Sequence, residues 1–100
     1  MSPCLLPLLL LTASCASPAP EFFGAKRSSI RQDGIEFVVF HKGERAEVVR
    51  RGYLRAQDRA GVQDSMIVAA EQATGCAVLP GSLRTGIPGD TGEARMALRC

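Results

Sequence analysis

The chain has 100 residues, with 12 Lys and Arg against 10 Asp and Glu and a formal net charge of +2. This near-neutral balance, with aromatic residues at only 5%, lacks the basic excess and stacking aromatics of nucleic-acid-binding proteins, so we expect no nucleic-acid partner. The length accommodates one small domain and excludes two.

The N-terminus has the pattern of a signal peptide. An apolar stretch runs from Leu5 to Leu11 and is followed by the small residues Thr12, Ala13 and Ser14. Its roughly seven residues suit the hydrophobic region of a signal peptide and fall well short of the ~20 that a membrane-spanning helix needs. We therefore predict a signal peptide over residues 1–14, removed on export.

The segment Leu11-Thr12-Ala13-Ser14-Cys15 resembles the lipid-attachment motif of bacterial lipoproteins. The resemblance implies that Cys15 carries diacylglycerol and an N-acyl chain in the outer membrane, facing the periplasm, so that membrane lipid is a partner. Cysteine pairing agrees, because losing Cys4 with the signal and acylating Cys15 leaves Cys76 and Cys100 as one pair. The alternatives are secretion without a lipid, since the small residues also satisfy the secretory cleavage rule, and a retained N-terminus.

Residues 15–20 are then the lipidated cysteine and a short proline-containing tether, and residues 21–100 are a single small domain. Phe22 and Phe23 follow the tether directly. We expect them in the core, because a domain without Trp needs its Phe residues for burial. A docking patch on the membrane side is the alternative.

The first half of the domain predicts a three-strand meander. Asp33-Gly34 supplies the two positive φ values of a type I′ turn. This turn joins a strand at 28–32 to one at 35–40, whose β-branched and aromatic residues favour a central position. The third strand is predicted over 46–54, with Gly52 at a bulge.

The second half predicts one helix and an extended C-terminus. Asp58 is the expected N-cap and Gly75 the C-terminal cap. The apolar helix face consists of Val62, Met66, Ala69, Ala70 and Ala73. We predict an extended segment at 76–79 and a loop over 84–92. Side chains over 93–100 then alternate strictly between two faces, as in a strand. The predicted fold class is α+β, with a small antiparallel sheet (three-strand meander), one helix and a C-terminal strand pair.

The two cysteines of the domain predict one disulfide. Alternation places Cys100 on the inward face of the last strand, while Cys76 follows the helix end. A bond between them closes a loop of about 25 residues and stabilises the fold by about 3 kcal/mol. Two cysteines and His41 fall short of a structural zinc set, and no Cys-x-x-Cys spacing occurs, so we expect neither a metal site nor a redox-active pair.

No motif predicts an enzyme or a cofactor site. Asp90-Thr91-Gly92 has the catalytic triplet of aspartic proteases, but no apolar strand precedes it and only eight residues follow, so we expect Asp90 to be a turn residue. His41 has no candidate nucleophile beside it. Gly81 and Gly86 have phosphate-loop spacing, yet Ile87-Pro88 stands where the phosphate-binding Lys and the Ser or Thr belong.

Positive charge gathers in the segment 42–55. It indicates an interaction surface for anionic lipid or for an acidic partner, with the loop over 84–92 as a second contact. The alternative is an edge strand guarded by charge against unwanted pairing. The candidate interaction residues are Lys42, Arg45, Arg50, Arg51, Arg55, Arg84 and Asp90.

Several blocks of the chain resemble small Gram-negative lipoproteins that have no assigned activity. The blocks are residues 22–25, 37–40, 74–76, 89–95 and Cys100. The resemblance implies a periplasm-facing domain and carries no catalytic residues. We expect a non-catalytic cell-envelope lipoprotein with an envelope protein partner; the alternative is a secreted or periplasmic module, without a lipid, that binds a small ligand or the cell wall.

Overall fold

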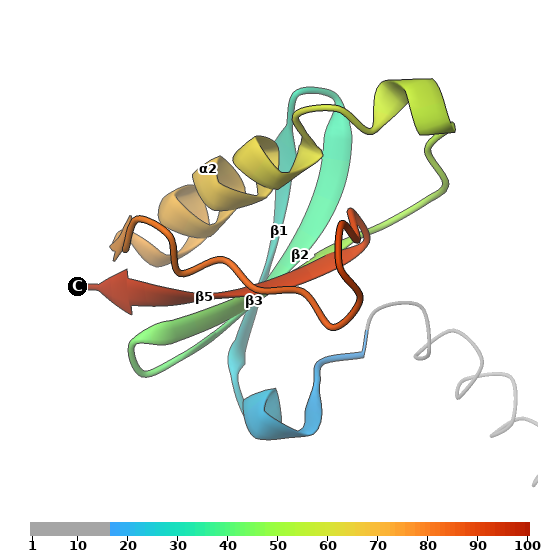
Figure 1. Ribbon diagram of the computed structural model, residues 1–100. Helices are drawn as coiled ribbons and strands as arrows, with labels where there is room; N and C mark the ends of the chain where they lie inside the picture. The colour runs from blue at the N-terminus through green and yellow to red at the C-terminus, as the bar shows by residue number, and fades with distance from the viewer. Residues whose placement is uncertain (1–16) are drawn as a thin grey trace, which may run out of the picture.

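The computed structural model describes residues 17–100. The elements in chain order are η2 Pro20–Phe22, β1 Lys26–Gln32, β2 Ile35–Lys42, β3 Arg45–Arg50, η3 Ala56–Asp58, α2 Val62–Thr74, β4 Ala77–Val78 and β5 Glu93–Arg99. The strands form one antiparallel five-stranded sheet in the order β1-β2-β3-β5-β4 (Figure 1). The predicted α+β class, the meander, the helix and the C-terminal strand pair are confirmed.

The β1–β2 hairpin depends on its two turn residues. Asp33 and Gly34 have φ values of 55° and 78°, as a type I′ turn requires, and Gln32 pairs with Ile35 across the turn. β2 lies between β1 and β3, and the stretch Phe37 to Phe40 is buried on both faces of the sheet. The predicted turn and the interior position of this strand are confirmed.

Helix α2 covers one face of the sheet and creates the main core (Figure 1). Its apolar stripe packs on the side chains of β2, β3 and β5 that point toward it. The buried residues of this core are Phe37, Val39, Ala46, Val48, Val62, Met66, Ala69, Ala70, Cys76, Ala94, Met96 and Leu98. The alternation predicted for the last strand is therefore confirmed, because every second residue of β5 from Ala94 faces the helix.

The helix begins later than predicted. Gly61, in the left-handed conformation with φ 78°, precedes α2, while Asp58 ends the short helix η3 and pairs with Arg55. The prediction of Asp58 as N-cap was wrong, because the left-handed Gly61 separates η3 from α2. The C-terminal cap was correct: Gly75 has φ 73° and its N–H donates to the Glu71 carbonyl.

The third strand is shorter than predicted. β3 ends at Arg50, and Gly52, with φ 85°, lies in a bend outside the strand. The Arg51 N–H still donates to the Glu36 carbonyl at 2.9 Å before the chain leaves the sheet. A strand reaching Leu54 with a bulge at Gly52 was wrong, because the positive φ turns the chain away from β2.

The C-terminal strand closes the domain. β5 lies between β3 and β4, and a backbone bridge between Arg84 and Arg95 holds part of the preceding loop against it. Cys100, directly after β5, forms a disulfide with Cys76. The predicted disulfide is confirmed, and it fastens the chain end to the junction between α2 and β4, where a terminus would otherwise fray.

The N-terminal segment covers part of the other face of the sheet (Figure 1). Phe22, 2% exposed, packs against Val38 and Phe40, whereas Phe23 is 62% exposed. The predicted core position is correct for Phe22 and wrong for Phe23. The cause is the turn after η2, which points the two neighbouring rings in different directions.

Replacing both disulfide cysteines, as Cys76→Ser with Cys100→Ser, should lower the free energy of unfolding by about 3 kcal/mol, because the unfolded chain regains the entropy of a 24-residue separation. Urea unfolding of the variant beside the oxidised wild type measures this. An unchanged midpoint would show that the bond contributes nothing.

Phe22→Ala should release the N-terminal segment, since truncating a buried Phe costs about 3 kcal/mol or more. The amide of Ala25, which donates to the Phe22 carbonyl at 3.0 Å, should then exchange with solvent faster. Phe23→Ala is the matched control on the exposed neighbour and should leave this exchange rate unchanged. Equal effects of the two substitutions would contradict the assignment.

Candidate functional site

Cys15 lies outside the described residues, so the first fixed contact after it defines the candidate site. The Ala19 N–H donates to Oε1 of Glu47 at 2.8 Å. Glu47 lies on β3, opposite Phe40 of β2 and Arg95 of β5, and is 2% exposed. The chain that leads from Cys15 is therefore held on the sheet face opposite α2.

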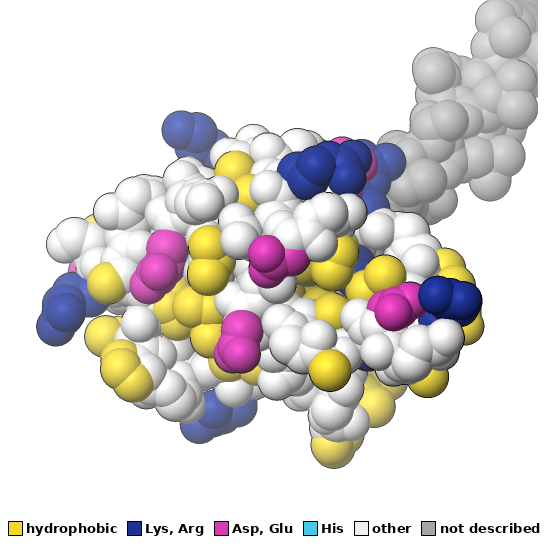
Figure 2. Space-filling model, turned by 90° about the horizontal axis from the view of Figure 1, so that it is seen from above, with side chains coloured by type: hydrophobic (Ala, Val, Ile, Leu, Met, Phe, Trp, Pro, Cys, Tyr) yellow, Lys and Arg dark blue, Asp and Glu magenta, His cyan; other side chains and the backbone are white. Residues whose placement is uncertain are grey.

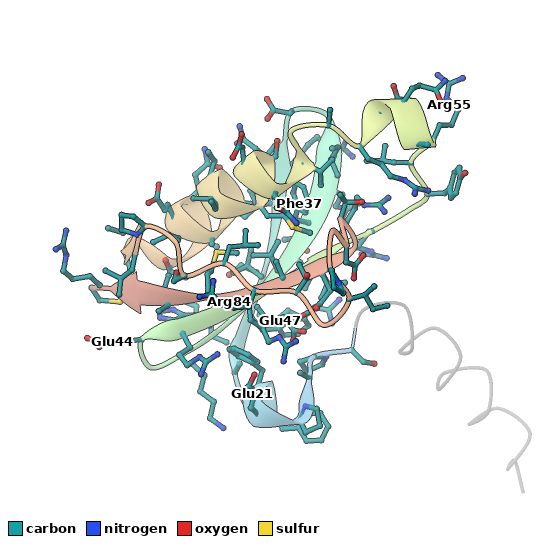
Figure 3. All side chains as sticks on the ribbon, in the orientation of Figure 1. Glu21, Phe37, Glu44, Glu47, Arg55 and Arg84 are labelled. Atoms are coloured by element: carbon teal, nitrogen blue, oxygen red, sulfur yellow. A yellow bond between two sulfur atoms is a disulfide. The ribbon has the colours of Figure 1, made fainter. Side chains whose placement is uncertain are left out.

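Charged side chains from three segments surround this contact. Arg95 Nε lies 3.0 Å from Glu93 Oε2, with both atoms shielded from solvent. Another nitrogen of the same guanidinium lies 3.6 Å from Glu21 of η2. Figure 3 labels Glu21 and Glu47, which lie in the region between η2 and the sheet. We call Glu21, Glu47, Glu93 and Arg95 the carboxylate cluster.

Burial changes the acidity of the cluster. The pKa of Glu47 is raised from 4.5 to about 7, mainly because the buried ionised carboxylate loses its water, and the hydrogen bond and charge of Glu93 contribute to the increase. The Ala19 N–H and Arg95 act in the opposite direction. Near neutral pH the cluster therefore retains a proton that an exposed carboxylate would have lost.

This arrangement attaches the N-terminal segment to the sheet. Glu47 is covered, so its carboxylate does not reach solvent; its Oε1 accepts the backbone N–H of Ala19. Arg95 connects η2 to β5 through Glu21. The cluster thus fixes the N-terminal segment by one hydrogen bond and an ion-pair network, beside the apolar contact of Phe22.

Sequence reasoning missed the carboxylate cluster. Alternation placed Glu93 and Arg95 on the face away from the helix, but no local pattern indicated that β3 and β5 are neighbours. The available signal was Glu47, the one charged residue in the apolar stretch 46–49 of this strand. A charge in such a place needs a buried partner.

The predicted interaction residues do not form one patch. Lys42 and Arg45 pair across the β2–β3 hairpin. The Lys42 ammonium donates to the Phe23 carbonyl at 2.9 Å, and Arg45 lies 3.9 Å from Glu21. These two residues therefore lie beside the N-terminal segment, next to the carboxylate cluster.

Three other arginines lie toward the opposite end of β3 and beyond. Arg50 donates to the carbonyls of Thr91 and Gly52 at 2.9 and 2.8 Å. Arg51 pairs with Glu36 at 3.6 Å, and Arg55 pairs with Asp58 at 3.2 Å. Arg50 thus holds the C-terminal loop in place.

The loop residues have local roles. Arg84 donates to the carbonyls of Gly81 and Leu83 at 2.7 and 2.9 Å. Asp90 accepts the Gly92 N–H at 2.8 Å through its side chain, so the predicted turn role of Asp90 is confirmed. Its carbonyl also accepts the Gln63 amide at 3.1 Å, which connects this loop to α2.

The fold places His41 beside the disulfide. The ligand-type atoms of His41, Cys76 and Cys100 all lie within 4.8 Å of one another, and His41 Nε2 lies 2.9 Å from the Gly43 carbonyl. A metal needs deprotonated thiolates, which the disulfide does not offer. In the oxidised chain the two cysteines form the disulfide, and the His41 imidazole lies next to it.

A hollow of about 290 Å³ lies where the C-terminal loop meets the start of α2. Its lining is Arg59, Gly61, Gln63, Asp64, Gly89 and Thr91. Arg59 is held by the Leu54 carbonyl at 2.9 Å and lies over the Tyr53 ring. The hollow is polar and close to the lower size limit of small-molecule sites.

No family model, no curated protein and no solved structure matches this chain. Within residues 17–100, no helix has both the length and the apolar composition needed to cross a bilayer.

Glu47→Gln should remove a pH dependence of stability. The native chain binds a proton at Glu47 up to about pH 7, whereas the unfolded carboxylate releases it near 4.5. The proton's contribution is therefore complete below pH 4.5 and disappears as pH rises through 7. Glutamine keeps an oxygen for the Ala19 N–H, so the variant should exceed wild type by up to about 3 kcal/mol at pH 8. Urea unfolding at pH 5 and pH 8 measures this; parallel pH profiles would contradict it.

Proposed function

We propose that the protein is a lipid-anchored domain of the bacterial cell envelope, attached to the membrane through Cys15, which binds a partner in the periplasm without catalysing a reaction. The observation that carries the proposal is the fixed N-terminal segment. Only four residues separate Cys15 from Pro20, and the segment is bound at Ala19 and Phe22. Such a short connection holds a folded domain close to its anchor.

The disulfide supports the proposed compartment. Cys76 and Cys100 are joined, and stable disulfides are typical of the periplasm and other oxidising compartments. With this pair formed, Cys15 is the cysteine of the processed chain that is left to carry a lipid. The cysteine chemistry is therefore consistent with an anchored periplasmic domain.

The buried charges favour a binding role over an enzymatic one. The perturbed carboxylate, Glu47, is covered by the N-terminal segment and accepts a backbone N–H. A general acid or base must reach its substrate, directly or through one water. The raised pKa of Glu47 therefore supports a structural attachment.

The partner would bind at the exposed loop that precedes β5. The loop over 84–92 exposes Ile87, at 69%, and this loop is fixed to the domain through Arg50 and Gln63. A loop that is already fixed and has an exposed apolar side chain suits protein recognition, because little conformational entropy is lost on binding.

A secreted or periplasmic ligand-binding module without a lipid is the second candidate. The polar hollow of about 290 Å³ beside Arg59 and Gln63 supports it. Both side chains are already engaged by backbone carbonyls, which leaves them less available to a ligand. We therefore place this function after the anchored domain.

Mass spectrometry of protein from bacterial envelopes tests the anchor. Wild-type chains should begin at Cys15 with added acyl mass, and Cys76 and Cys100 should react with an alkylating agent only after reduction. Cys15→Ser should remove the acyl mass and release the protein from membranes. Wild-type chains without acyl mass, extracted by buffer alone, would reject the anchor and favour the secreted module.

A further inference from the structure

The N-terminal turn exposes an aromatic ring. The Ala25 N–H donates to the Phe22 carbonyl at 3.0 Å. Phe23, with φ −62° and ψ 133°, is followed by Gly24 with φ 84°, the geometry of a type II turn, whose second central residue needs a positive φ. Phe22 faces the sheet and Phe23 is 62% exposed. Burial in the core therefore accounts for Phe22. It does not account for Phe23, whose ring stays exposed.

Three basic residues lie beside this turn on one face of the sheet. Arg27, at the start of β1, is exposed, whereas its neighbour Lys26 pairs with His41 and lies on the helix face. Arg27 lies over the Phe40 ring at 5.7 Å, and the Lys42 ammonium lies 2.9 Å from the Phe23 carbonyl. Register places Arg27, Lys42 and Arg45 on the same sheet face as Phe40. We call Phe23, Arg27, Lys42 and Arg45 the basic turn surface.

Charge differs between the two sides of the domain. Near the basic turn surface, Glu21 is shared between Arg45 and Arg95 at 3.9 and 3.6 Å. Helix α2, on the other side, has Asp64 and Glu71 and contains neither Lys nor Arg. Figure 2, which looks down on the helix side, shows acidic side chains over its centre and Lys or Arg mainly around its rim. The side where the chain enters is thus the more basic one.

The proposed anchor keeps the basic turn surface close to the membrane. Phe23 lies eight residues after Cys15, a distance that a fully extended chain spans in at most about 28 Å. With Cys15 acylated, the basic turn surface stays within reach of the bilayer. A second contact made by a tethered group works at high effective concentration, so a weak affinity is enough.

We propose that the basic turn surface lies on an anionic phospholipid bilayer. This inference rests on the proposed lipid anchor. The Phe23 ring enters the interface, where aromatic side chains are favourable, and the three cations lie among the headgroup phosphates. The domain is thereby oriented with α2 and its acidic side chains away from the membrane.

A single tryptophan tests this orientation, because the chain contains no Trp. The acylated full-length protein with Phe23→Trp is reconstituted into vesicles of phosphatidylethanolamine with phosphatidylglycerol, and into neutral phosphatidylcholine vesicles. Brominated lipids should quench the Trp emission and the spectrum should shift to the blue, several-fold more strongly in the anionic vesicles. Tyr53→Trp is the matched control: Tyr53 is 80% exposed and precedes η3, away from η2, so its Trp should remain accessible to aqueous quencher.

Charge removal tests the headgroup contact. In the Phe23→Trp protein, Lys42→Gln with Arg45→Gln should reduce lipid quenching several-fold in anionic vesicles, as added salt should. Arg55→Gln, which removes an exposed cation outside the surface, should leave it unchanged. Equal quenching in neutral and anionic vesicles would overturn the recognition of anionic lipid.

The acyl mass of the same sample separates the two proposals. An acylated protein whose Trp at position 23 stays in water would overturn the docking surface while leaving the anchor intact, and would point to a protein partner on this face. Chains without acyl mass would overturn the anchor and, with it, this orientation.

Discussion

The pairing of β5 with β3 is the constraint on which the rest of the structure depends. It brings the last strand of the chain into the sheet beside the first meander, so that Ala94, Met96 and Leu98 complete the core beneath α2. The same pairing places Glu93 and Arg95 next to Glu47 on the other face. It also brings Cys100 to the end of α2, where it forms the disulfide with Cys76. One strand contact thus sets the core, the disulfide and the carboxylate cluster.

The two faces of the sheet bury different kinds of side chain. The helix face is apolar, which provides most of the stabilisation available to a domain of this size. The other face buries charge, at a cost in desolvation that the Arg95 ion pairs and the Ala19 hydrogen bond offset only in part, so the pKa of Glu47 stays raised. We infer that the N-terminal segment is as much a part of the folded domain as the strands.

Attachment and orientation would act together in the proposed envelope role. A lipid on Cys15 would set the distance from the membrane, and the bound segment at Ala19 and Phe22 would limit rotation of the domain about its tether. The perturbed acidity of Glu47 belongs to the same region, because Glu47 is buried and accepts the Ala19 N–H. The proposed function depends on these contacts and on the N-terminal pattern.

Local patterns determined much of the fold. Asp33-Gly34 specified the first hairpin, helical spacing from Val62 specified α2, and alternation specified the inward face of β5, because each pattern encodes a backbone period or a required φ value. The disulfide was predictable for the same reason, since alternation pointed Cys100 inward. Local signals were insufficient at two places: the left-handed Gly61 delays the start of α2 beyond Asp58, and β3 ends before Gly52, whose φ is positive.

Only the tertiary structure decided the candidate site. The strand order β3-β5 is a long-range pairing that no short pattern encodes, and it is what joins Glu47, Glu93 and Arg95. The division of the two phenylalanines, with Phe22 buried and Phe23 exposed, depends on how the turn meets the sheet. The sequence by itself determined the periods, the turns and the N-terminal pattern from which lipid attachment at Cys15 is predicted. The fold alone determined which charges became neighbours, because burial and proximity arise only when distant segments pack.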